Sequence, residues 1–118
     1  MTDRKAFSIS LRQAVLDKTE GRCSYCGTNI SIDGFAVDHF VPLAKGGTND
    51  FDNLMPSCAE CNTRKNAMDI ERFRERIDKY FDRFWITQAC VNFPCFVPYG
   101  NWYQIRFYFE YLNKLAEG

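Results

Sequence analysis

Two pairs of cysteines constrain the fold of this chain more than any other feature of its sequence. Both pairs have the spacing C-x-x-C, with Cys23 and Cys26 in the first and Cys58 and Cys61 in the second. Four thiolates in this arrangement suit tetrahedral Zn²⁺, and a four-cysteine site has no open coordination position. We therefore predict a structural zinc ion. The alternatives are ordinary buried cysteines or a redox motif, although a redox motif would not explain the second pair.

The 31 residues between the pairs are too many for a compact zinc ribbon, so they must form a structural unit of their own. A length of 118 residues suits a single domain covering 1–118. So short a chain buries a modest core, which a structural metal would support. Hydrophobic residues make up 46% and aromatic residues 16%, which excludes a disordered chain.

Charge and targeting signals narrow the class of protein further. Fifteen basic and fifteen acidic residues cancel, which counts against a nucleic-acid binder unless the charges are segregated by face. The N-terminus has no signal-peptide pattern, and no apolar run approaches a membrane span. We expect a cytoplasmic protein, bacterial or phage-encoded, without membrane contact. Its cysteines should then be metal ligands or free thiols.

Local patterns predict a first helix and a hairpin around the cysteine pairs. The helix is expected over residues 11–18 or 11–19, after a loose arm at 1–8, with Ser10 as its N-cap. A turn at Asp33-Gly34 should lead into a strand over 35–41 that Pro42 ends. A short return strand is expected at 53–55. Pro56 should then break the chain before the second cysteine pair.

Beyond the second pair the pattern becomes helical, from about Asn62 or Thr63. A break is expected near Met68, with Asp69 as the cap of a further helical segment. One apolar stripe follows at spacings of three and four, formed by Ile70, Phe73, Ile77, Tyr80 or Phe81, and Phe84. Residues 85–100 show no clear period. A final amphipathic helix is expected after Asn101, starting with Trp102.

The only histidine of the chain, His39, follows Asp38 on the predicted strand. Side chains of neighbouring strand residues point to opposite sides unless the strand is distorted. Phosphodiester hydrolysis needs a base for water and a cation on the phosphate. Histidine suits the base because its ordinary pKa lies near neutrality. Oxygens of Asp38 and Asn62 are hard ligands, appropriate to Mg²⁺ or Mn²⁺.

The order of these motifs resembles the HNH endonuclease family, in its four-cysteine zinc-containing branch. The motifs are C-x-x-C, Asp-His-x-x-Pro, Gly-Gly-Thr-Asn-Asp, Asn-Leu and C-x-x-C-Asn-x-x-Lys, within about residues 12–68. The resemblance implies an α+β fold with a small ββα-metal core, in which a hairpin and a helix hold one catalytic divalent cation. An N-terminal helix and a helical, aromatic-rich extension over 69–118 should flank this core.

The resemblance also implies roles for individual residues. His39 matches the general base that activates water, and Asp38 matches a ligand of the catalytic cation. Asn53 matches the asparagine that braces the loop and helps to orient the base. Asn62 matches the last residue of the family's name, a second cation ligand. The expected reaction is hydrolysis of DNA that leaves 5′-phosphate and 3′-hydroxyl ends.

Substrate contacts are expected from the segment that follows Asn62. Lys65 resembles a basic residue that would hold a phosphate oxygen, and Arg64 is a further candidate. Asn66, one helical turn after Asn62, should share its face and is a second candidate for metal or phosphate contact. The alternatives to a DNA endonuclease are a non-catalytic zinc module that binds nucleic acid and an RNA-directed nuclease.

The remaining features of the extension leave alternatives open. Cys90 and Cys95 are expected to be buried free thiols, with a second metal site or a disulfide as the alternatives. The mixed charges over residues 69–78 favour a solvated helix face over a basic patch. The dense aromatic residues favour a core or a homodimer contact over stacking platforms for bases.

Overall fold

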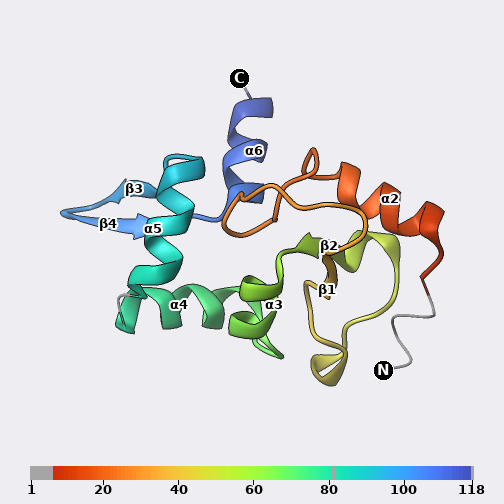
Figure 1. Cartoon of the computed structure of the whole chain (residues 1–118). Coiled ribbons are helices and arrows are strands. Elements are labelled where there is room, and N and C mark those ends of the chain that lie inside the picture. The colour runs from red at the N-terminus through yellow and green to blue at the C-terminus, as the bar shows by residue number, and fades with distance from the viewer. Residues whose placement is uncertain (1–6, 81, 118) are drawn as a thin grey trace.

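The computed structural model describes residues 7–80 and 82–117, so the expected arm at 1–8 lies mostly outside the described residues. Helices and two separate two-stranded antiparallel sheets make up the fold, which confirms the α+β class. No described helix is both long and apolar enough to cross a membrane. The hairpin of β1 and β2 lies beside α3, while α4, α5 and the second hairpin lie on the other side of α3 (Figure 1).

Helix α2 (Ile9–Asp17) covers the first hairpin. Its N-cap is Ser8, whose Oγ accepts a hydrogen bond from the Leu11 amide at 3.1 Å, so the expected cap at Ser10 was wrong. Ser8 caps because its extended backbone places Oγ over the first turn. Val15 and Leu16 are buried against Phe35 and Leu54. This packing anchors the helix on the sheet.

Strands β1 (Ala36–His39) and β2 (Leu54–Ser57) pair in a regular antiparallel register, with His39 opposite Leu54. The strand expected at 35–41 is therefore shorter, and β2 continues through Pro56, which we expected to break it. The Pro56 carbonyl accepts from the Ser24 amide at 2.9 Å, away from β1. Because the N–H and C=O of a strand residue face the same side, the missing N–H of Pro56 costs no bond to β1.

Between the strands, two short 3-10 turns, η1 (Leu43–Lys45) and η2 (Phe51–Asn53), shape the loop. Helix α3 (Ala59–Lys65) follows β2 and starts before the expected Asn62, because Cys58 caps it: its Sγ accepts from the Cys61 amide at 3.4 Å. The expected break near Met68 is present.

Helix α4 (Ile70–Tyr80) begins after that break, with Asp69 Oδ1 accepting from the Arg72 amide at 2.8 Å. Its buried side includes Phe73 and Ile77, two members of the predicted apolar stripe. The alternative stripe position Phe81 lies outside the described residues.

The extension after α4 departs from the sequence pattern. Residues 85–100, whose hydrophobic residues show no regular spacing, form most of α5 (Arg83–Asn92) and the first strand of a hairpin. The hairpin consists of β3 (Phe96–Tyr99) and β4 (Trp102–Ile105). The final helix, α6 (Tyr108–Ala116), starts well after Asn101, so placing Trp102 in it was wrong. Gly100-Asn101 forms a two-residue turn with a positive φ at Gly100, which favours a hairpin over a helix.

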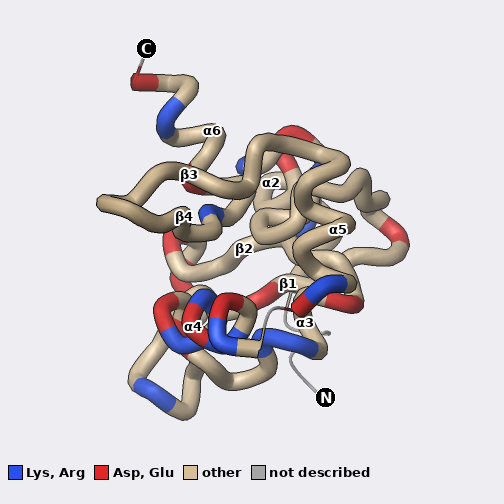
Figure 2. The backbone as a smooth tube through the Cα atoms, turned by 90° about the vertical axis from the view of Figure 1, so that its left-hand side faces the viewer, with Lys and Arg blue, Asp and Glu red and all other residues tan. Residues whose placement is uncertain are grey.

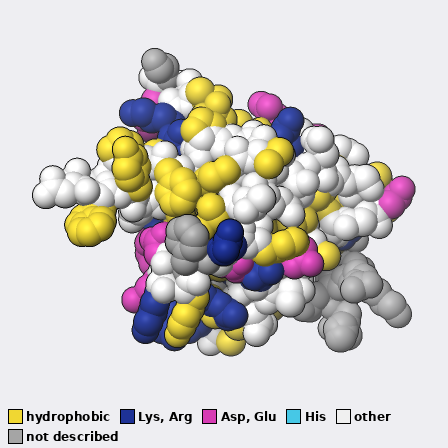
Figure 3. Space-filling model, turned by 60° about the vertical axis from the view of Figure 1, so that its left-hand side comes forward, with side chains coloured by type: hydrophobic (Ala, Val, Ile, Leu, Met, Phe, Trp, Pro, Cys, Tyr) yellow, Lys and Arg dark blue, Asp and Glu magenta, His cyan; other side chains and the backbone are white. Residues whose placement is uncertain are grey.

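Aromatic side chains of the extension form much of the core. Phe107 stacks on Phe73 with ring centroids 5.2 Å apart, and the Trp85 ring meets Phe107 edge-on at 5.5 Å. The second hairpin differs, because Phe96, Tyr99, Trp102 and Tyr103 are 39–77% exposed. Hydrophobic side chains stand out at the left of the space-filling view (Figure 3). A role for these exposed rings in a homodimer or in base stacking stays a prediction.

Cys90 and Cys95 form a disulfide, so the expectation of free thiols was wrong. Cys90 is also exposed, whereas Cys95 is buried. The chain reverses between α5 and β3, which brings the two Cα atoms to 5.4 Å, within the usual range for a disulfide. The hydrophobic residues around Cys90 and Cys95 follow neither helical nor strand spacing, so the sequence contained no signal for this reversal of the chain.

Candidate active site

The four cysteines of the two C-x-x-C pairs meet at one point. Their Sγ atoms all lie within 4.8 Å of one another, and Cys26 and Cys58 are 3.8 Å apart. Tetrahedral Zn²⁺ with bonds of about 2.3 Å requires sulfur atoms about 3.8 Å apart. Backbone amides of Tyr25 and Cys61 point at two of the sulfurs, at 3.4 Å each. The cluster therefore fits a zinc ion, which would tie the segment of the first cysteine pair, the knuckle at residues 23–27, to the start of α3.

The first knuckle is enclosed by the C-terminal extension. Gly27 has a φ of 76°, and a Cβ there would lie 3.1 Å from the Phe93 ring. Glycine therefore permits both the backbone reversal and the close packing. Gln88 Nε2 lies 3.2 Å from Cys26 Sγ, and Asn92 Nδ2 donates to the Cys26 carbonyl at 3.0 Å. Helix α5 thus supports the zinc cluster directly.

Asp38 projects from β1 into the interior. Its Oδ2 lies 3.1 Å from the Lys65 ammonium and accepts a hydrogen bond from the Tyr25 hydroxyl at 2.6 Å. Burial raises the pKa of Asp38 above its usual value, although Lys65 and Tyr25 act in the opposite direction. The described residues donate no hydrogen bond to Oδ1. That oxygen is available for a cation.

His39 is only half-buried and has a different partner. Its Nε2 lies 2.7 Å from Asn49 Oδ1. An amide oxygen only accepts, so in the neutral ring the proton sits on Nε2 and the lone pair on Nδ1. The regular register of β1 sends Asp38 and His39 to opposite sides, as their positions on a strand predict.

Asn53 braces the loop between the two strands. Its Oδ1 accepts from the Val41 amide at 2.8 Å, and its Nδ2 donates to the carbonyls of Val41 and Thr48 at 3.0 and 2.8 Å. The loop is tight there, because a Cβ on Gly47 would lie 1.8 Å from the Val41 oxygen. These contacts suit the role that the resemblance implies, while a role in catalysis stays a prediction.

The residues of α3 divide into exposed and enclosed side chains. Asn62 is exposed, which leaves its amide free for a cation. Asn66 is also exposed and is the C-cap of α3, with a φ of 49° and its amide donating to the Asn62 carbonyl at 2.9 Å. Its role as a ligand stays a prediction.

The two basic residues of α3 have partners inside the molecule. Arg64 pairs with Asp82, the N-cap of α5, and lies over the Phe84 ring at 5.0 Å. Lys65 has no exposed side-chain surface, and its Nζ also donates to the His39 and Phe40 carbonyls at 3.1 and 3.3 Å. Phosphate binding by either residue stays a prediction, and for Lys65 it requires the Asp38 pair to open.

The segment that contains the four cysteines, the β1–β2 hairpin and α3 matches a known protein family. Residues 23–68 match the family model for the HNH endonuclease. This segment is an HNH domain. Its four-cysteine cluster fits the zinc-containing branch of the family.

Two much longer proteins are similar to part of this chain. The CRISPR-associated endonuclease Cas9 of Corynebacterium diphtheriae is 42% identical over 45 residues, which is 37% of this chain and 4% of that protein. The crystal structure of the Type II-C Cas9 enzyme from Actinomyces naeslundii is similar with a TM-score of 0.53 and 30% identity, covering 58% of this chain and 8% of that one. The chain therefore spans only a small part of either relative.

Three supporting residues of the HNH domain and its extension were not anticipated from the sequence. Tyr25 links the zinc knuckle to Asp38, Asn49 holds His39, and Gln88 contacts the zinc cluster. Tyr25 lies between two cysteines and Asn49 in a turn-rich segment, where both residue types are ordinary. Only their contacts in space reveal the roles.

Proposed function

We propose that this chain is a DNA endonuclease that hydrolyses phosphodiester bonds with one divalent cation, Mg²⁺ or Mn²⁺. The products would carry 5′-phosphate and 3′-hydroxyl ends. The observation that supports the proposal best is the placement of Asp38 and His39 on β1. The Asp38 carboxylate contacts Lys65 of α3, and the His39 ring contacts Asn49 of the loop that Asn53 braces. The match of residues 23–68 to HNH endonucleases supports the reaction class.

His39 serves as the general base in this proposal. With Nε2 held by Asn49, the Nδ1 lone pair accepts the proton of the attacking water. The Asn49 contact fixes the orientation of the His39 ring before the substrate binds. The Phe7 ring is a second neighbour of His39, with ring centroids 6.3 Å apart.

Asp38 and Asn62 would hold the catalytic cation. Their side-chain oxygens are hard donors of the kind that Mg²⁺ and Mn²⁺ prefer. When bound, such a cation supplies charge stabilisation at the phosphate and the leaving oxygen. Lys65 pairs with the buried Asp38 through Oδ2, so a cation would bind the carboxylate through its other oxygen. The bacterial sources of both relatives support a bacterial origin, and a cytoplasmic location is part of the proposal.

Cleavage of supercoiled plasmid tests the proposal. Wild type with Mg²⁺ or Mn²⁺ should nick the plasmid, and His39→Ala should lower the rate by about 10²–10⁴, the usual contribution of a general base. Unchanged zinc content and circular dichroism would show that the variant is folded. A wild type that binds plasmid without cutting it under either metal would refute the enzyme. Preferential cutting of a matched RNA would refute DNA as the substrate.

A further inference from the structure

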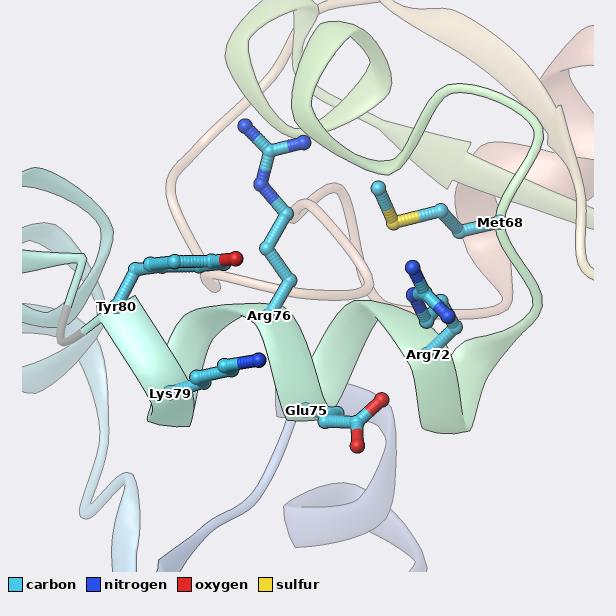
Figure 4. A pocket seen from close by; sticks show the side chains of 6 residues that line it. All are labelled: Met68, Arg72, Glu75, Arg76, Lys79 and Tyr80. Atoms are coloured by element: carbon cyan, nitrogen blue, oxygen red, sulfur yellow. The ribbon is translucent and has the colours of Figure 1, made fainter.

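An open hollow of about 530 Å³ lies along α4, and all of its lining residues except Met68 follow the segment that matches the HNH family. Six side chains line it, namely Met68, Arg72, Glu75, Arg76, Lys79 and Tyr80. Three of them are basic, namely Arg72, Arg76 and Lys79, and these project from successive turns of α4 around the hollow (Figure 4). We call this surface the α4 hollow.

The charges of α4 are sorted by side. Arg74 is buried, pairs with Glu71 at 3.1 Å and with Glu110 at 2.7 Å, and does not line the hollow. In contrast, Arg72, Arg76 and Lys79 are exposed and form no ion pair with any residue of the described ranges 7–80 and 82–117. Along the chain the acidic and basic residues of α4 are interleaved (Figure 2), and basic side chains lie together at the lower left of the space-filling view (Figure 3).

The sorting leaves the α4 hollow with three cations and one anion, Glu75. The α4 hollow therefore carries an excess of positive charge in a protein with no net charge. Guanidinium groups also suit phosphate in geometry, because they donate two parallel hydrogen bonds. The charge and the donor geometry together favour an anionic ligand of several phosphates.

The spacing and place of the cations suit a nucleic-acid strand. Arg72 and Lys79 are seven residues apart, about 10.5 Å along the helix axis. One strand of duplex DNA carries a phosphate about every 3.4 Å of its axis, so this length matches about three phosphates. Met68 lines the hollow just after α3 ends at Lys65, which connects the hollow to the HNH domain.

We propose that the α4 hollow binds backbone phosphates of the DNA strand beside the bond that the HNH domain cuts. The inference rests on the proposed function. Arg72, Arg76 and Lys79 contact phosphate oxygens, and the exposed Tyr80 hydroxyl lies at the rim as a further donor. Because these contacts do not read bases, the surface strengthens binding to every DNA sequence by a similar amount.

Salt-dependent binding of a duplex oligonucleotide tests the α4 hollow. In a His39→Ala background that leaves the duplex uncut, Arg72→Ala, Arg76→Ala and Lys79→Ala should each weaken binding and reduce the slope of log K against log salt by about 0.9. Lys114→Ala on α6 removes the same charge from an exposed site outside the hollow and should change neither quantity. Glu75→Gln should tighten binding, a gain that unfolding cannot produce.

The outcomes separate this inference from the proposed enzyme. With His39 present, the hollow variants should raise KM for plasmid nicking and leave kcat unchanged. Hollow variants that match Lys114→Ala in affinity and slope would overturn the inference, even if wild type cuts DNA. The inference would also be overturned if the hollow bound polyglutamate and not DNA. Loss of binding in the hollow variants of a chain that cuts nothing would support the hollow and refute the enzyme.

Discussion

Breaking the buried pair of Lys65 and Asp38 should strongly destabilise the HNH domain, and Lys65→Met tests this. The substitution keeps an unbranched chain but removes an ammonium with no exposed surface. Asp38 would then keep only the Tyr25 hydroxyl, and the His39 and Phe40 carbonyls would lose a donor. Removing one partner of a buried pair usually costs about 3–5 kcal/mol.

Urea and thermal unfolding of the zinc-loaded protein would measure this loss. For a domain of this size, a loss of about 3–5 kcal/mol corresponds to a fall in Tm on the order of 10–20 °C. Lys114→Met, at an exposed position on α6, is the matched control and should change stability by no more than about 0.5 kcal/mol. The comparison separates the buried pair from the general loss of a lysine.

A double-mutant cycle decides whether the charge of Asp38 causes the loss. Asp38→Asn removes the charge that Lys65→Met would leave unpaired, so the double variant should recover much of the stability lost by Lys65→Met alone. A loss of less than about 1 kcal/mol in Lys65→Met would refute the reasoning. A double variant as unstable as the sum of the two single ones would refute it too.

Three further predictions concern the zinc cluster and the loop. Cys58→Ser, or removal of zinc with a chelator, should abolish folding as followed by circular dichroism and zinc content, since metal binding and folding are linked; a folded, zinc-free variant would contradict this. Asn53→Ala removes three hydrogen bonds near the surface and should lower the free energy of unfolding in urea by about 1–2 kcal/mol. The nicking rate of the folded variant should also fall. An unchanged nicking rate would show that the loop does not orient the base. Asn49→Leu should lower kcat about fivefold without changing KM, because a lost hydrogen bond of about 1 kcal/mol misorients His39. Asn49→Asp, which keeps the acceptor oxygen, should restore kcat, and equal loss in both variants would rule out the hydrogen bond.

Several elements could be predicted because their signals are local in the sequence. The C-x-x-C spacings identify the zinc ligands, and the turn residues and alternation around Val37 identify the first hairpin. The apolar stripe through Phe73 and Ile77 identifies α4. The second hairpin was missed although Gly100-Asn101 is a hairpin signal, because the helical spacing from Trp102 onward competes with it. Cap positions shifted where backbone geometry, rather than residue type, selects among nearby serines and cysteines.

The sequence by itself determined the inventory of chemistry: four thiolates for zinc, one histidine beside a carboxylate, and the motif order of an HNH domain. Only the tertiary structure decided which groups meet. It buried Lys65 against Asp38, placed Asn49 on His39, and turned Arg74 inward while leaving Arg72 and Arg76 in the α4 hollow. The physical reason is that pairing and burial join residues far apart in the chain, whereas local periodicity reports only which side of an element a residue occupies.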